Sequence, residues 1–165
     1  MSEEFESRLR SAIQRGHRRA EHGEAGKRAK RLTDDELRSM HTTLRLRLSE
    51  RIERAVHRVA DHFPGFREES IFGEAGWGHA CYRDDLNIVA GRRNNLYSRL
   101  EMVIRPFNDS RVVDLKGKAT VANREIFNRG FFQPIAEADG EEFDSLIDTW
   151  AIEYAEQYAA RQRAR

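Results

Sequence analysis

Four arginines in the first half of the chain have the spacing of a possible anion-binding row. A helix would place them in one narrow band beside its apolar stripe, because they recur every three or four residues. The four are Arg47, Arg51, Arg54 and Arg58. Asp144 and Asp148 border a second apolar stripe near the end of the chain. We predict ion pairs between the two helices, made above all by Arg51 and Arg54. The alternatives are a row that binds phosphates or an acidic partner, or plain solvation.

Trp77, His79 and Cys81 alternate along the sequence, so a strand would present all three on one face. The pair of His79 and Cys81 supplies two metal ligands, whereas a zinc site needs three or four, and the chain has no second cysteine. A Cys/His nucleophile would also need an orienting acid, and none can be identified. We therefore predict no metal site, and interpret the segment as a half-buried strand with a hydrogen-bonded histidine.

The residues between these three are small, namely Gly76, Gly78 and Ala80. Small side chains on one face of a strand would let a helix approach the sheet closely there. On this interpretation Trp77 and His79 point to the opposite, open face.

The strongest predicted strand runs from Leu96 to Arg105, with apolar and polar residues in alternation. Its polar side and the following strands would give the open face of a sheet these residues, with Trp77 and His79 as further members: Tyr97, Arg99, Glu101, Arg105, Lys118, Thr120 and Arg124. Basic groups interleaved with aromatic rings bind single-stranded nucleic acids. Glu101 and Asp114 could instead pair with the same cations. The face is thus a nucleic-acid surface, a solvated charged surface, or a contact between two copies.

Two long amphipathic helices should position these residues. The first spans Thr33 to Phe63, begins with a capping box of Thr33 and Glu36, and ends at Pro64. The second spans Glu141 to Ala160.

The segment between them, from Trp77 to about Val121, consists of short apolar runs separated by turn residues. Short connections join antiparallel strands, so we expect a meander of four or five strands. The segment 123–130 fits either a strand or a short helix. The predicted fold class is α+β, a two-layer sandwich with both helices on one face of the sheet.

Composition divides the chain into three parts. Residues 1–31 form a basic arm with a short helix over Ser2 to Arg15, followed by a flexible linker from Gly16 to Arg31. Residues 32–160 form the single α+β domain, and residues 161–165 form a basic tail. Phe5, Leu9 and Ile13 lie on one side of the short helix and need a partner surface.

The single cysteine and the lack of a leader or a long apolar run lead us to expect a soluble, cytoplasmic protein without membrane contact. The preference for arginine over lysine is typical of GC-rich bacterial genomes. No phosphate-binding loop, nucleophile elbow, zinc spacing or internal repeat occurs, so no cofactor is predicted.

We expect a non-catalytic binding or adaptor protein that associates with itself or with another protein. The first alternative is an accessory nucleic-acid-binding protein that uses the basic arm and the open sheet face. The second is a small-ligand sensor or enzyme centred on His79 and Glu101, with Cys81 nearby.

Overall fold

The computed structural model describes residues 3–29 and 32–163, which form three long helices, a short 3-10 helix and one sheet. The elements in chain order are α1 (Glu3–Ala29), α2 (Asp34–His62), β1 (Arg67–Ile71), β2 (Trp77–Val89), β3 (Arg92–Ile104), β4 (Val112–Val121), β5 (Arg124–Pro134), η1 (Ile135–Glu137) and α3 (Gly140–Arg163). The five strands are antiparallel and lie side by side in chain order.

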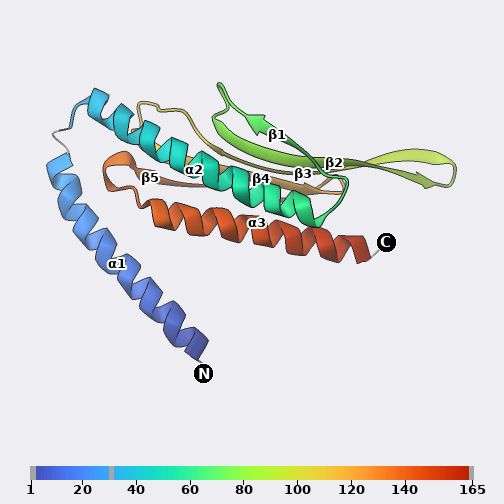
Figure 1. Ribbon diagram of the computed structural model, residues 1–165, viewed down its shortest axis with the longest axis horizontal. Coiled ribbons are helices and arrows are strands. Elements are labelled where there is room, and N and C mark those ends of the chain that lie inside the picture. The colour runs from blue at the N-terminus through green and yellow to red at the C-terminus, as the bar shows by residue number, and fades with distance from the viewer. Residues whose placement is uncertain (1–2, 30–31, 164–165) are drawn as a thin grey trace.

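Helices α2 and α3 lie next to each other on one face of the sheet and run in the same direction (Figure 1). The predicted two-layer α+β fold is therefore confirmed. Both apolar stripes turn inward, because the sheet has one dry face that must be covered. Side chains from both layers form the core, and the largest that are fully buried include Leu48, Ile52, Leu100, Met102, Ile104, Phe143 and Tyr154.

Helix α2 begins and ends where its sequence signals indicate. The Thr33 hydroxyl accepts a hydrogen bond from the backbone N–H of Glu36 at 3.2 Å and lies 3.2 Å from the Glu36 carboxylate. Helix α2 stops at His62, just before Phe63 and Pro64.

The sheet has two features that the sequence pattern missed. Strand β1 precedes Trp77, where the predicted meander begins; four of its five residues are exposed, so they show no alternating pattern. Strand β2 continues without a break for 13 residues, which is longer than the short runs that the sequence indicates. The ambiguous segment 123–130 lies almost wholly in strand β5, and Ala122 and Asn123 form the preceding turn with positive φ.

The outer half of the β2–β3 hairpin extends past the helices as a two-stranded ribbon (Figure 1). Strand β3 pairs with β4 only from Arg99 to Ile104, so the part nearer the hairpin turn has no third strand. Leu86 and Ile88 are exposed on this ribbon.

Helix α1 is longer than expected and continues through Gly16, so residues 16–29 are helical and do not form an irregular linker. This segment is rich in Ala, Arg, Glu and Lys, whose high helix propensity outweighs the cost of its glycines. The predicted boundary at residue 31 lies outside the described residues. Residues 161–163 continue α3, and the last two residues of the predicted basic tail also lie outside the described part.

The close approach of a helix to the sheet occurs at Gly117, and not at Gly76 or Gly78 as predicted. A Cβ atom on Gly117 would lie 2.7 Å from the Trp150 ring of α3. A Cβ on Gly78 would instead meet the Met102 carbonyl oxygen of the neighbouring strand. Gly78 therefore allows the close approach of the neighbouring strand and does not contact a helix.

Candidate functional site

The arginine row divides into a paired half and an unpaired half. Arg47 pairs with Asp144 at 2.8 Å, and Arg51 makes a two-pronged contact with Asp148, with Nε to Oδ1 at 3.0 Å. Arg54 and Arg58 are exposed and make no ion pair with any described residue. The first two arginines thus join the parallel helices, while the last two remain available to solvent or a partner.

The open face of the sheet carries Tyr97, Arg99 and Glu101, as the alternation in β3 predicted. Arg99 lies between two carboxylates, 2.7 Å from Glu69 and 3.3 Å from Glu101. Lys118 stands opposite Glu101 in the neighbouring strand, and Thr120 stands opposite Arg99. Because acids alternate with bases here, the charges of this face are largely balanced by one another.

Arg105 lies just past the end of β3, where its backbone N–H donates to the Asp114 carbonyl at 2.8 Å. Its side chain is exposed. Arg105 therefore borders the open face instead of lying within it.

Trp77 and His79 lie on the helix-covered face, which corrects their predicted position. His79 stands directly opposite the buried Met102, and the guanidinium of Arg45 in α2 lies 4.0 Å from the centre of the Trp77 ring. The reason is the register of β2: its small residues face the side without helices, so its large residues turn toward α2.

A cluster of His57, Glu68 and His79 joins the end of α2 to strands β1 and β2. The Glu68 carboxylate lies 2.9 Å from Nδ1 of His57 and 3.0 Å from Nε2 of His79. This hydrogen bond to Glu68 raises the pKa of His57. Partial burial alone would raise the pKa of Glu68, but its contacts with the two histidines hold that pKa below its ordinary value. Sequence reasoning missed the cluster because it missed β1.

The centre proposed for His79 and Glu101 is not assembled, because the two side chains lie on opposite faces of the sheet. Cys81 is fully buried beside His79 on the helix face. Burial raises its pKa to about 12, so it remains a protonated thiol at neutral pH.

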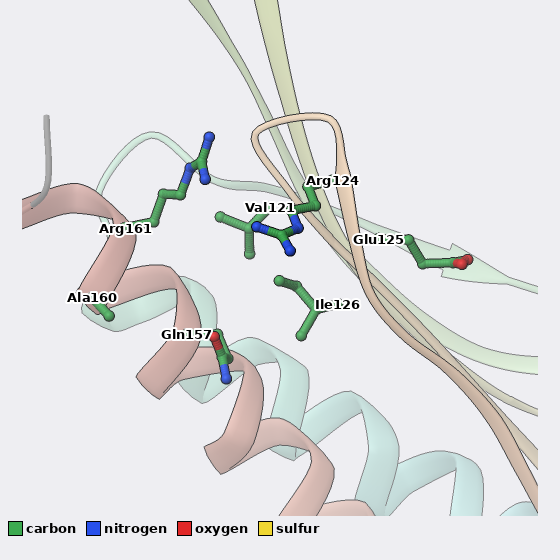
Figure 2. Close-up of a pocket in the computed structure, with 7 residues that line it drawn as sticks. All are labelled: Val121, Arg124, Glu125, Ile126, Gln157, Ala160 and Arg161. Atoms are coloured by element: carbon green, nitrogen blue, oxygen red, sulfur yellow. The ribbon is translucent and has the colours of Figure 1, made fainter.

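Arg124 lies at a cleft of about 430 Å³ between the start of β5 and the last turns of α3 (Figure 2). Val121 and Ile126 supply apolar walls, and Gln157 and Arg161 come from α3. Figure 2 shows the Arg124 side chain turned toward α3, while Glu125 points away from the cleft. Neither arginine forms an ion pair with a described residue, so the cleft is basic.

A larger apolar groove of about 610 Å³ lies on the outer side of the helix pair. Its lining is mainly apolar and includes Ala55, Val59, Phe63, Ala151, Ile152 and Ala155. Arg58 and His62 border it on α2, and Asp148 borders it on α3. The groove could not be predicted from the sequence, because its walls come from two helices that lie far apart in the chain.

In comparisons with known proteins, no family model, curated protein or solved structure matches the chain. Across residues 3–29 and 32–163, no helix has the length and apolar character needed to cross a membrane. Among the same residues, no group of three or more His, Cys, Asp or Glu side chains is placed to hold a metal ion.

Replacing Arg51 with Gln should lower the free energy of unfolding by up to about 1 kcal/mol, because both partners of the pair are partly exposed. Arg54→Gln is the matched control and should leave stability unchanged. Thermal unfolding of both variants, and of Asp148→Asn with and without Arg51→Gln, measures the coupling. Equal melting temperatures for the wild type and Arg51→Gln would contradict the pairing.

The contribution of His57 to stability should depend on pH. Its pKa is raised in the folded state, so the stabilisation is complete below about pH 6.5 and disappears as pH rises through the folded value. The lowered pKa of Glu68 acts at the acidic end of the pH range, where its stabilisation is lost as pH falls below about 4.5.

The melting-temperature difference between the wild type and His57→Gln should therefore be largest between about pH 5 and 6.5, and should shrink toward pH 9. His17→Gln, at an exposed position of α1, is the control for the loss of an exposed histidine. A difference that grows with pH would show that Glu68 does not hold His57 in its charged form.

Proposed function

We propose that this chain is a non-catalytic binding protein of the adaptor type that works as a homo-oligomer. The observation that carries the proposal is the uncovered apolar side of α1. Phe5, Leu9 and Ile13 are 50%, 40% and 49% exposed and lie one turn apart on a helix that points away from the body (Figure 1). A single exposed apolar residue is ordinary, but three in a row on a projecting helix form a contiguous docking strip.

Two observations favour binding over catalysis. The buried Cys81 is held as a thiol, which is the unreactive form. The His57, Glu68 and His79 cluster brings acid and base groups together, yet none of these residues lines any of the cavities described above. A thiol kept in this state is also compatible with the reducing cytoplasm that we propose as the compartment.

The oligomer should depend on the strip. Light scattering of the full chain over a range of concentrations should give a mass above that of one chain, and Phe5→Asp with Ile13→Asp should return it to the mass of one chain. Gln14→Asp introduces the same charge on another side of α1 and should leave the mass unchanged. A wild-type chain that is monomeric at every concentration would contradict self-association, and turnover in a broad hydrolase and oxidoreductase screen would contradict the non-catalytic role.

Nucleic-acid binding is the second candidate, and arginines at one end of the molecule favour it. Arg92 and Arg93 lie on the β2–β3 ribbon. The ribbon is joined to the turn before Arg124, because the Asn123 side chain donates a 2.7 Å hydrogen bond to the Asn95 carbonyl. Arg161 lies across the cleft from Arg124 (Figure 2). These four arginines form no ion pair within the described part of the chain.

Affinity for single-stranded and duplex DNA probes should then fall steeply with salt, because phosphate contacts release counterions. Replacing Arg92 and Arg93 with Gln should reduce the salt slope by about two units, one for each lost contact. Arg54→Gln, in the unpaired half of the arginine row, is the control for general loss of charge. Binding that is absent at low salt would exclude this candidate.

A further inference from the structure

We infer that the strip on α1 and the groove between α2 and α3 are the two halves of one contact, made between two copies of this chain. In the resulting dimer each copy places α1 in the groove of the other. This inference rests on the proposed self-association and specifies which surfaces make it.

The two surfaces match in length and in chemistry. The strip from Phe5 to Ile13 covers eight residue steps of helix, about 12 Å. The α2 wall of the groove runs from Ala55 to His62, which is seven steps and about 10 Å, and Phe63 extends it just past the end of the helix. Ile152 on the α3 wall is 67% exposed, so the groove lacks a cover along its outer side. A third helix laid over the pair would bury the strip and Ile152 together.

The orientation of α1 favours the groove of a second copy over the groove of its own chain. Arg18 and Arg19 hold α1 against its own body through ion pairs with Glu141 and Glu142. Leu9 precedes Arg18 by nine positions, about two and a half turns, so the strip lies on the opposite side of α1 from the Arg18 anchor. To turn the strip toward its own body, α1 would have to rotate about its axis and give up the Arg18 pair. A second copy meets the strip without any such movement.

The charges beside the two surfaces are complementary. Arg8 and Arg15 lie along one side of the strip, and the exposed Glu156 lies on α3 one turn after Ile152 of the groove, whereas Asp148 is already paired with Arg51. Glu6, on the other side of the strip, is paired with Arg10, so the charge match is that of Arg8 and Arg15 with Glu156, in the one helix direction that turns these arginines toward α3. Each copy carries both surfaces, so the contact is made twice and closes a two-fold symmetric dimer.

The test uses two single variants of the full chain. Leu9→Asp removes the strip and keeps the groove, while Ile152→Asp removes the groove and keeps the strip. Ile88→Asp, at an equally exposed apolar residue of the ribbon, is the matched control. Circular dichroism checks that each variant is folded, and sedimentation or light scattering gives the dimer dissociation constant.

Each of the first two variants should weaken the dimer about 100-fold, because about tenfold is lost at each of two equivalent contacts. Ile88→Asp should have no effect. An equimolar mixture of Leu9→Asp and Ile152→Asp should recover about tenfold in affinity, because the mixed dimer has one intact contact and both substitutions fall in the other. Substitutions in the same contact are not additive, so the second adds little to the tenfold already lost there. Native mass spectrometry identifies that mixed dimer directly.

Other arrangements give different results. A dimer formed by α1 against α1 would be weakened by Leu9→Asp and unaffected by Ile152→Asp, and a dimer formed by the ribbons would be weakened by Ile88→Asp. Either result overturns this contact and leaves the proposed self-association intact. A wild-type chain that is monomeric at every concentration overturns both this contact and the proposed self-association. That result is also expected if α1 folds into the groove of its own chain.

Discussion

The contact of Trp150 with Gly117 fixes the separation of the two layers of this protein. With no side chain on Gly117, the indole rests directly on β4, and the ring of Phe127 packs beside it with centroids 6.2 Å apart. Helix α3 is thereby held close to the sheet, and α2 is held beside α3 by the pairs of Arg47 with Asp144 and Arg51 with Asp148. The outer groove exists because the parallel helices are fixed at this depth and their outer sides have no further layer above them.

Residues with a repeating environment could be predicted from the sequence. The stripe of α2 and the alternation of β3 each follow from a single period, and the capping box at Thr33 is a local signal that needs no tertiary information. The same local reasoning correctly anticipated that an arginine band beside one stripe would meet an acidic band beside the other. Of the two arginines predicted to pair, Arg51 forms its ion pair and Arg54 does not, because the pairing depends on where α3 begins along α2 and the second acid meets Arg47 instead.

The predictions that failed concern features determined by neighbours distant in the chain. Strand β1 is mostly exposed and is a strand because β2 offers it a partner, so its own residues carry no pattern. Trp77 and His79 lie on the helix face and not on the predicted open face, because the small residues between them do not mark the approach of a helix. Position 78 needs glycine for another reason: a Cβ atom there would clash with the Met102 carbonyl oxygen of the adjacent strand. The cluster of Glu68 with two histidines and the groove between the helices both combine elements that only the fold brings together.

Strand β1 forms one of the two edges of the sheet and limits its growth at that edge. It is five residues long, and Arg67, Glu68 and Glu69 place charges at its start. A short, charged edge is a poor template for another strand, since a newcomer would bring few backbone hydrogen bonds and would have to desolvate those charges. Chain-to-chain addition at this edge, the route by which exposed sheets form fibrils, is thereby opposed by the ordinary composition of one small strand.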